Sequence, residues 1–163
     1  MSDSNEQATT GPASAFAGET AEFVTFVIDG QLFGIPVLGV QDVLSAHKIA
    51  RIPLAPSEIA GSLNLRGRIV TAFDVRRRLG LSPWQDDGET MSIVVEHDNE
   101  LYSLLVDSVG EVLALAVSDY EKNPPTLAPR IREYSSGIYR LDDQLLVVLD
   151  VDALLQYDRA KAA

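Results

Sequence analysis

The residues that could carry catalysis or bind a ligand are few and widely spaced in this sequence. His47 and His97 have no second imidazole or carboxylate at the local spacing of a metal site or a general-base pair. Asp107 and Glu111 are spaced as an acid–base pair, but they lie at a predicted strand end in the most acidic part of the chain. A solvated strand edge is the simpler interpretation of that pair.

The sequence also lacks the motifs that define common catalytic sites. It contains no cysteine, no G-x-S-x-G, no H-E-x-x-H, no G-x-G-x-x-G and no P-loop. Asp86 and Asp87 are most simply linker charges, and the aromatic residues form no stripe on which the bases of a single strand could stack. We therefore predict a protein that is not an enzyme and that has no cofactor and no metal.

One turn combines a cation with a rigid frame. Within Gly61–Val70, two predicted strands are joined at Arg66-Gly67, where glycine accepts the backbone angles of a tight turn. Arg66 should project from the tip of this hairpin, and a solvated arginine is the ordinary interpretation. However, Arg51, Arg66 and Arg68 lie together in an otherwise acidic chain, and a rigidly held guanidinium can bind a carboxylate through two hydrogen bonds. The turn is therefore a candidate site for an acidic group of a partner.

The distribution of charge argues against nucleic acid and membranes as partners. The net charge is −11, with no base in residues 1–22, seven bases and four acids in residues 23–85, and six bases and sixteen acids in residues 86–163. Phosphate groups require clustered lysine and arginine, which the acidic second half lacks. No apolar run approaches the roughly 18 residues that span a bilayer, and the N-terminus has no basic start typical of a secretory signal. We expect a soluble, cytoplasmic protein.

Short apolar runs broken by turn residues predict many short strands. Phe23–Ile28 and Gln31–Val37 flank Asp29-Gly30, a dipeptide typical of a type I′ hairpin turn. Further strands are expected at Ser62–Leu65, Arg68–Phe73, Met91–Glu96, Leu101–Val106, Val109–Val117, Gly137–Leu141 and Gln144–Leu149. Short helices are expected at Ser57–Ala60, Val75–Leu79 and Val151–Tyr157, the last two capped by Asp74 and Asp150. Residues 1–20 should be a disordered tail, and residues 82–89 and 121–132 should be linkers.

Two offsets align the first half of the chain with the second. An offset of 69 places Gln31-Leu32-Phe33 on Glu100-Leu101-Tyr102, Val40 on Val109, and Asp42 on Glu111. An offset of 76 places Gly61 on Gly137 and Asp74-Val75 on Asp150-Val151. A longer proline-rich loop in the second half would absorb the difference between the offsets. We infer a tandem duplication within a domain of residues 21–160, with units at about residues 23–81 and 91–157.

Each unit has about five short strands and a closing helical turn, the pattern of a small β-barrel. The duplication therefore predicts a mainly β fold with two five-stranded barrels and few short helices. A unit of about sixty residues buries too little surface to be stable alone. We expect the two units to share an apolar surface.

A set of short segments carries a family resemblance. They are Phe23–Val27, Phe33–Val37, Val40–Leu44, Ile52-Pro53 with Pro56, Gly61–Gly67, Phe73–Arg76, Val106–Val112 and Leu149-Asp150. Over nearly all of residues 22–157 the chain resembles the CheW-type coupling proteins of bacterial chemotaxis. The most specific element is Asn64-Leu65-Arg66-Gly67 followed by a strand and an Asp-hydrophobic-Arg step. The chain departs from the family at Asp42, where glutamate is usual, and at Phe73-Asp74-Val75, where Ile-Asp-Leu is usual.

The resemblance implies two SH3-like barrels side by side and an adaptor without chemistry of its own. Such an adaptor ties the cytoplasmic tips of methyl-accepting chemoreceptors to the histidine kinase CheA, in arrays near the inner membrane. The receptor tip would face an apolar groove near Val40 and the hairpin that carries Arg66, and the second barrel would meet the regulatory domain of CheA. The implied partner-binding residues are Val40, Asp42, Asn64, Leu65, Arg66 and Gly67.

Two alternatives remain at this stage. A small β-barrel could bind a ligand in its interior, although barrels of this size usually fill with their own side chains. A CheW-like scaffold could also serve a signalling pathway unrelated to motility. An enzyme is a weaker third possibility because no nucleophile–base pairing is evident.

Overall fold

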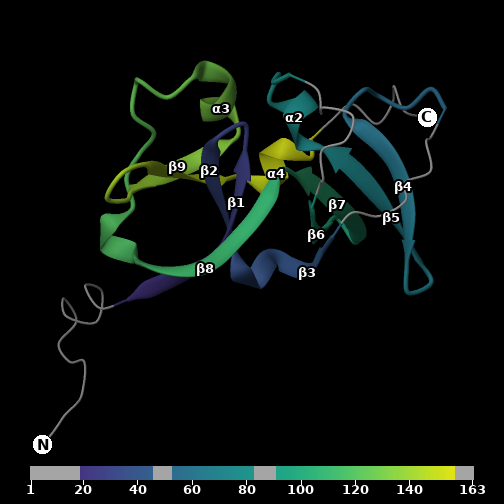
Figure 1. The fold of residues 1–163 in the computed structure, drawn as a ribbon, viewed down its shortest axis with the longest axis horizontal. Coiled ribbons are helices and arrows are strands. Elements are labelled where there is room, and N and C mark those ends of the chain that lie inside the picture. Colours follow the sequence, from purple (N-terminus) through teal and green to yellow (C-terminus); the bar gives the residue numbers. More distant parts are fainter. Residues whose placement is uncertain (1–18, 46–52, 83–90, 157–163) are drawn as a thin grey trace, which may run out of the picture.

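The computed structural model describes residues 19–45, 53–82 and 91–156, and its architecture is mainly β (Figure 1). In this part of the chain, the strands form two five-stranded sheets. Sheet 1 has the order β8-β1-β2-β10-β9, and sheet 2 has the order β3-β6-β7-β5-β4. The strands are β1 (Thr20–Ile28), β2 (Gln31–Pro36), β3 (Val40–Leu44), β4 (Ile59–Leu65), β5 (Arg68–Asp74), β6 (Met91–His97), β7 (Glu100–Val106), β8 (Ser108–Ala116), β9 (Ser135–Arg140) and β10 (Leu145–Leu149). The predicted mainly β fold with two five-stranded units of sheet is confirmed.

The helices are short, and two of them begin after a capping aspartate. They are α2 (Val75–Arg78), α3 (Pro129–Glu133) and α4 (Val151–Leu154), with 3-10 turns η2 (Val37–Gly39) and η3 (Val117–Asp119). The Asp74 carboxylate accepts a hydrogen bond from the Arg77 backbone N–H at 3.2 Å, and Asp150 accepts one from the Ala153 N–H at 3.1 Å. Each aspartate therefore satisfies a donor that the helix itself leaves unpaired. Both predicted caps are present.

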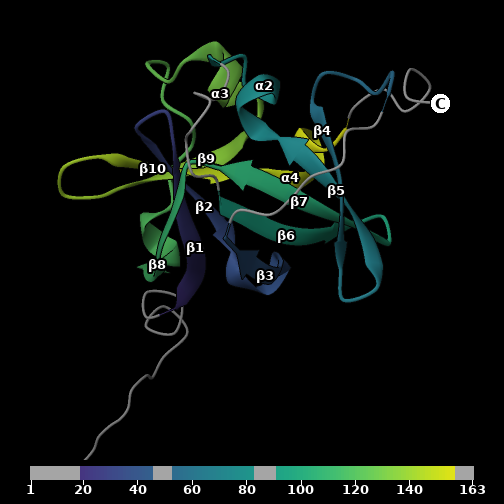
Figure 2. The same ribbon diagram turned by 45° about the vertical axis from the view of Figure 1, so that its right-hand side comes forward.

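Each sheet contains strands from both halves of the chain. The hairpin β1–β2 of the first unit lies in sheet 1 between β8 and β10 of the second unit, and the hairpin β6–β7 of the second unit lies in sheet 2 between β3 and β5 of the first. Figure 2 shows β3 passing beneath the β6–β7 hairpin while β8 runs beside β1. A unit of the sequence repeat is therefore not a sheet by itself.

The two sheets have the same strand order and the same register under the offsets found in the sequence. In sheet 1, β10 pairs in parallel with β2, and Val147 lies opposite Phe33; in sheet 2, β5 pairs in parallel with β7, and Thr71 lies opposite Tyr102. The offset of 76 relates Val147 to Thr71, and the offset of 69 relates Phe33 to Tyr102, so the two pairs are equivalent in the repeat. Both sheets also have a register shift at the same place. It lies between Val24 and Phe26 in the β1–β8 pairing and between Val40 and Asp42 in the equivalent β6–β3 pairing. The arrangement supports an internal duplication in which the units have exchanged hairpins.

A hydrophobic core lies between the two sheets and contains side chains of both. Its largest fully buried members include Phe26, Phe33, Phe73, Tyr102 and Leu104. The rings of Phe26 and Phe33 stack with their centroids 5.5 Å apart. Burying one such side chain is worth about 1.5–3 kcal/mol, so this shared core holds the two sheets together.

Two smaller clusters pack on the other faces of the sheets. Sheet 2 carries Leu63, Val70, Ala72, Val94, Leu101 and Leu105, and sheet 1 carries Phe23, Tyr139, Leu146 and Val148. The two clusters occupy equivalent positions, since Leu63 corresponds to Tyr139, Val70 to Leu146, and Ala72 to Val148. Each sheet therefore fills its own concave side with its own side chains.

Three predicted elements differ from the structure. Residues 57–60 form a turn and the start of β4, because backbone pairing of Ile59 with Phe73 takes this segment into the sheet instead of a helix. Residues 121–132 are more than a linker: Leu127 is buried in the shared core, and α3 begins at Pro129. Thr20 already belongs to β1, whereas residues 1–18 and most of the predicted linker 82–89 lie outside the described residues.

Candidate partner-binding site

The turn between β4 and β5 consists of two residues, Arg66 and Gly67, and arginine is unusual at its first position. Arg66 and Gly67 both have positive φ values, 52° and 86°, as a type I′ turn requires. Glycine adopts this region freely, but an arginine there is strained. The Asn64 side-chain oxygen accepts a hydrogen bond from the Gly67 N–H at 3.0 Å and so fixes the turn. The prediction that Gly67 accepts the turn angles is confirmed, and Arg66 shares them.

Asp42 of β3 lies next to this turn. Its carboxylate is 3.2 Å from the Arg66 guanidinium, and the Arg66 side chain is 77% exposed while that of Asp42 is 27% exposed. The other carboxylate oxygen of Asp42 accepts a hydrogen bond from the Val43 N–H at 2.9 Å. An exposed ion pair of this kind contributes at most about 1 kcal/mol to stability. Its main effect is therefore to orient the guanidinium.

The ion pair connects β3, at one edge of sheet 2, with the turn that leads into β4 at the other edge. Because β3 and β4 are the first and last strands of that sheet, a contact between Asp42 and the β4–β5 turn requires the sheet to curl until its edges approach. A cavity of about 130 Å³ lies at this end of the curled sheet. It is lined by Gln41, Asp42, Leu65, Arg66, Arg68, Val94 and Leu101, which come from β3 to β7. This curl is the geometry of a small β-barrel.

The structure brings three of the predicted site residues to this cavity: Asp42, Leu65 and Arg66. Asn64 and Gly67 shape the turn beside it. Val40 lies two residues before Asp42 in β3, but it is half-buried and packs against the shared core. Val40 therefore belongs to a neighbouring apolar surface.

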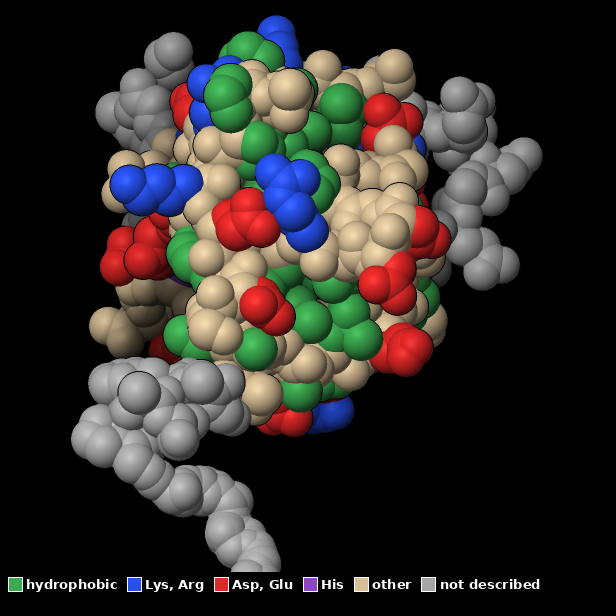
Figure 3. Space-filling model, turned by 90° about the vertical axis from the view of Figure 1, so that its left-hand side faces the viewer, with side chains coloured by type: hydrophobic (Ala, Val, Ile, Leu, Met, Phe, Trp, Pro, Cys, Tyr) green, Lys and Arg blue, Asp and Glu red, His purple; other side chains and the backbone are tan. Residues whose placement is uncertain are grey.

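That apolar surface includes η2 and β3, and β8 carries apolar residues at the equivalent positions of the repeat. Val40 and Val109 pack against the core, whereas Val43 of β3 and Val112 of β8, which are equivalent in the repeat, are exposed. Leu38 of η2 is 95% exposed. Figure 3 shows that, on the face at the left of Figure 1, hydrophobic side chains also gather into patches with acidic side chains around them. Exposed apolar side chains beside a fixed charge are a frequent composition of protein interfaces.

Sequence reasoning missed a network of hydrogen bonds around a second arginine, Arg76. Arg76 of α2 donates two hydrogen bonds to Asp107, at 3.1 and 2.9 Å, and one to the Ser82 carbonyl oxygen at 2.8 Å. Asp107 also accepts a hydrogen bond from the Asp29 N–H in the β1–β2 turn. The hydrogen bond to Asp107 raises the pKa of Arg76 further, although burial opposes this change. Asp107 is therefore part of a clamp between distant segments and not the solvated edge that the sequence suggested.

His97 also differs from the expected solvated histidine. Its side chain is only 12% exposed, with Nδ1 3.1 Å from Asp152 and Nε2 3.4 Å from Asp98. His47 lies outside the described residues. Among the described residues, no group of three or more histidines and acids is arranged to hold a metal ion, and no helix is long and apolar enough to cross a membrane. The sequence alone could not predict the contact of His97 with Asp152, because the two residues are 55 positions apart and only the fold brings them together.

Comparison with known proteins bears on the family. The family model of the CheW-like domain matches residues 22–159, which is most of the chain. The chain belongs to the CheW-like family. Chemotaxis protein CheW of Klebsiella aerogenes is 31% identical over 144 residues, which make up 87% of this chain and 87% of that protein. Chemotaxis protein CheW of Helicobacter pylori is 25% identical over 153 residues, 94% of this chain and 92% of that protein.

The fold agrees with the family. The crystal structure of the scaffolding protein TtCheW from Thermoanaerobacter tengcongensis superposes with a TM-score of 0.77 at 26% sequence identity. The match covers 86% of this chain and 95% of that protein. The function of the chain is accordingly that of a chemotaxis adaptor.

Proposed function

We propose that this chain couples the cytoplasmic tips of methyl-accepting chemoreceptors to the histidine kinase CheA, without catalysing a reaction itself. Membership of the CheW-like family supports this role. The adaptor would act in receptor arrays near the inner membrane. Its effect would be a shift in the population of kinase states, transmitted through its interfaces.

The observation that carries the proposal is the position of Arg66. This arginine occupies a strained turn conformation at an exposed tip, and a half-buried aspartate orients its guanidinium. Strained backbone persists where the surrounding structure enforces it, often at binding sites. A guanidinium held in this way is prepared for an acidic group of a partner, because little side-chain freedom is lost on binding.

The apolar surface along β3 supports a receptor contact near this turn. Receptor tips are helical in this interpretation, and a helix presents an apolar stripe that needs an apolar partner surface. Val40 and Val43 lie on the same strand as Asp42, so the charge and the apolar surface are adjacent. We propose that Val40, Asp42, Asn64, Leu65, Arg66 and Gly67 together form or shape this contact.

The second contact, with the regulatory domain of CheA, would use sheet 1. The position in sheet 1 that corresponds to Arg66 is Asp142, in the turn between β9 and β10, and Asp143 follows it. Both aspartates are exposed. The two ends of the molecule therefore carry opposite charges on equivalent turns, which suits an adaptor that holds two different partners.

The rival function, a barrel that binds a small ligand, has less support. The concave sides of both sheets are packed with their own side chains, such as Val70 and Leu146, which are fully buried. One cavity lies at the end of sheet 2 and another between the sheets. A ligand inside either curled sheet would have to displace this packing.

Co-sedimentation tests the proposal. Purified chain is mixed with a receptor cytoplasmic fragment assembled on vesicles and with a CheA-type kinase, each also omitted in turn. We expect the kinase to sediment with receptors only when the chain is present. Kinase that sediments equally well without the chain would contradict a coupling role. Binding of a scaffold kinase from a non-motility pathway in place of the chemotaxis kinase would favour the alternative pathway.

A further inference from the structure

The side chain of His97, at the end of β6, lies between two carboxylates. Its Nδ1 is 3.1 Å from Asp152 of α4, and its Nε2 is 3.4 Å from Asp98 of the β6–β7 turn. The imidazole itself is only 12% exposed. Because β6 and β7 belong to sheet 2 and α4 follows β10 of sheet 1, the contact between His97 and Asp152 connects the two sheets.

The protonation state of this imidazole decides whether both contacts are attractive. A neutral imidazole has one N–H and one acceptor nitrogen, whereas an imidazolium has two N–H groups. Ionised carboxylates only accept hydrogen bonds. A neutral ring can therefore present its N–H to Asp98 or to Asp152, and its acceptor nitrogen then faces the other carboxylate. The protonated ring attracts both carboxylates and offsets the repulsion between them.

The first unit connects its helix to its hairpin turn by direct attraction. The offset of 69 relates Asp98 to Asp29. The offset of 76 relates Asp152 to Arg76, whose guanidinium lies 3.9 Å from the Asp29 carboxylate. Arginine keeps its charge at any physiological pH, so this connection does not depend on protonation. In the second unit both positions hold an acid, and the connection runs through His97.

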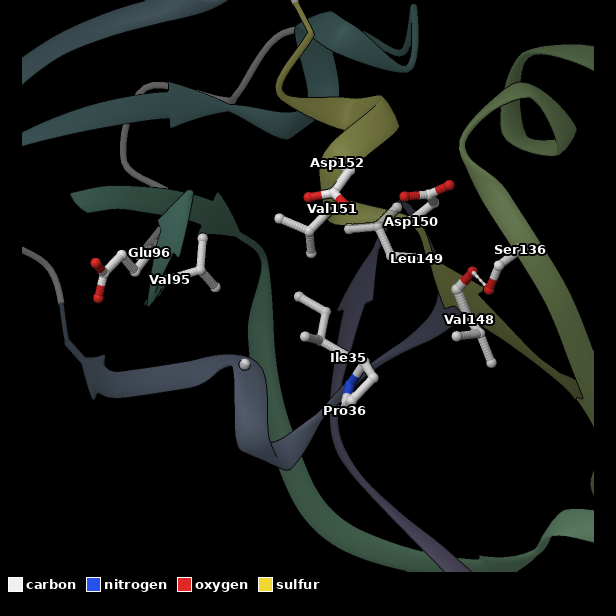
Figure 4. Close-up of a pocket in the computed structure, with 11 residues that line it drawn as sticks. Ile35, Pro36, Val95, Glu96, Ser136, Val148, Leu149, Asp150, Val151 and Asp152 are labelled. Carbon is white, nitrogen blue, oxygen red and sulfur yellow. Dashed lines mark hydrogen bonds between the residues drawn. The ribbon is translucent and has the colours of Figure 1, made fainter. Parts of the chain in front are cut away.

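The other ionisable side chains near His97 are mostly acids. Those on β6, β7 and α4 are Glu96, Glu100, Tyr102, Asp150 and Asp152. Figure 4 shows Glu96 on one side of a cavity of about 460 Å³ between the sheets, with Asp150 and Asp152 above it. The Tyr102 ring lies edge-on to His97 at a centroid distance of 6.2 Å, and its hydroxyl donates a hydrogen bond to Glu100.

Cations are scarce at this place. Arg78 binds the far end of α4, where its Nε donates a hydrogen bond to the Leu154 carbonyl oxygen at 3.0 Å. Among the described residues, no lysine or arginine forms an ion pair with Asp98 or Asp152. The protonated ring of His97 is therefore the cation that can hold these two aspartates together.

We propose that His97 is a proton-dependent link between the β6–β7 hairpin and α4. With the ring protonated, both aspartates are held, and the hairpin of sheet 2 stays fixed to the helix that follows sheet 1. With the ring neutral, one contact is lost and the two acids repel each other, so α4 opens more readily. Histidine side chains change their charge between about pH 5 and pH 8, so the link responds within the physiological range. The proposal does not depend on the proposed function.

Hydrogen exchange of two equivalent helix amides in the full chain, followed by two-dimensional NMR, tests the link. The Leu155 N–H donates to the Val151 carbonyl oxygen in α4 at 2.9 Å. Its equivalent, the Leu79 N–H, donates to the Val75 carbonyl oxygen in α2 at the same distance. Leu79 is the internal control, because Arg76 keeps its charge throughout the pH range used.

The measured quantity is the protection of Leu155 divided by that of Leu79, each corrected for intrinsic exchange. We expect this ratio to be about threefold to fivefold higher at about pH 5.5 than at about pH 7.5. The effect is modest because the carboxylates of Asp98 and Asp152 are largely exposed. A ratio that is equal at the two pH values, or higher at about pH 7.5, would overturn the proposal.

Two variants identify the group that titrates. His97→Gln keeps a hydrogen-bonding side chain that carries no charge, so its ratio should be the same at both pH values. The double variant His97→Ile with Asp152→Arg copies Ile28 and Arg76 of the first unit, so its ratio should be high at both pH values. The parent's pH dependence, if retained in either variant, would show that another group titrates and would contradict the assignment. Each variant decides this question alone, so the test survives if the other does not fold.

Discussion

The guanidinium of Arg66 lies 3.2 Å from the carboxylate of Asp42, although Asp42 is on β3 and Arg66 is in the β4–β5 turn at the opposite side of the same five-stranded sheet. The contact therefore requires sheet 2 to be curled, and it orients the Arg66 guanidinium at the tip of the β4–β5 hairpin. In sheet 1 the corresponding residues are Glu111 and Asp142, which are both acidic and exposed. Sheet 1 therefore has no pair of opposite charges at this place, whereas sheet 2 has one.

A charge exchange separates the internal contact of Arg66 from a contact with a partner. In the double variant Asp42→Arg with Arg66→Asp, the ion pair can form in the opposite sense, so the melting temperature should stay within a few degrees of the parent. Receptor control of the kinase should nevertheless be lost, because the cation that meets the partner has moved to β3. Normal receptor control of the kinase by the folded double variant would show that coupling needs only the internal ion pair, and it would contradict a contact between Arg66 and a partner.

Splitting the chain at Gln85 should give halves that do not fold alone. Each sheet combines strands of both halves, so either half would expose the core face and the unpaired edges of its hairpins. We expect poorly dispersed NMR spectra from residues 1–85 and from residues 86–163, and a native-like spectrum when the two are refolded together. Well-dispersed spectra from the separate halves would contradict the exchange of hairpins.

Loss of the Arg76–Asp107 clamp should destabilise the fold. Arg76 makes three hydrogen bonds, two of them to a charged acceptor, and connects α2 with the start of β8 and the β1–β2 turn. Replacing Arg76 with Ala leaves Asp107 without this partner, and the free energy of unfolding should fall by about 1–3 kcal/mol. Arg77→Ala, on the same helix but exposed, is the matched control and should change it by less than about 0.5 kcal/mol. Urea unfolding of both variants makes the comparison.

Stability should decline in alkaline solution, partly because of Tyr139. Burial raises the pKa of the Tyr139 phenol above its usual value, and the nearby Tyr120 and Asp119 add to this effect. The unfolded chain releases the phenolic proton near pH 10, whereas the folded chain retains it. The stabilisation is therefore complete below about pH 10 and is lost as the pH rises through the folded pKa.

The variant Tyr139→Phe tests this effect, since it keeps the ring that packs edge-on against Phe23 at a centroid distance of 5.4 Å. Between about pH 9 and about pH 11, its urea midpoint should fall less than that of the parent. An identical fall in both proteins would mean that Tyr139 does not contribute.

Deleting residues 1–18 should leave folding and coupling unchanged. These residues are rich in small polar side chains and acids, so they offer little apolar surface to bury, and ordering them would cost about 1–2 kcal/mol per residue in backbone entropy. The deletion ends before Thr20, the first residue of β1. A melting temperature lowered by many degrees would show that the segment packs on a sheet.

The local pattern of the sequence was sufficient for most strands and for both helix caps, because turn dipeptides and capping aspartates act over a few residues. The offsets of 69 and 76 found in the sequence also relate the registers of the two sheets, since they convert the pair Val147–Phe33 into the pair Thr71–Tyr102. The exchange of hairpins could not be predicted, since both the exchanged and the unexchanged arrangement satisfy the same pattern within each unit. Strand β3 was missed because Val40–Leu44 is short and contains two polar residues.

The candidate site was predicted in part. The Asn64–Gly67 turn is a local motif, so its geometry could be anticipated from four residues. The pairing of Arg66 with Asp42 could not, because it depends on the curl of a whole sheet. The Arg76–Asp107 and His97–Asp152 contacts were missed for the same reason: their partners are 31 and 55 residues apart.

The most direct test of the coupling role is kinase activity in a reconstituted mixture of receptor fragments, a CheA-type kinase and this chain. Arg66→Glu should melt close to the parent temperature, because a surface change usually alters stability by less than about 0.5 kcal/mol. It should fail to support receptor-controlled kinase activity, since charge reversal at a partner contact costs on the order of 2–5 kcal/mol in binding. Arg68→Glu, two residues further on, carries the same charge change and should retain most of the activity. Normal receptor-controlled kinase activity with a well-folded Arg66→Glu protein would contradict the proposed role of this turn.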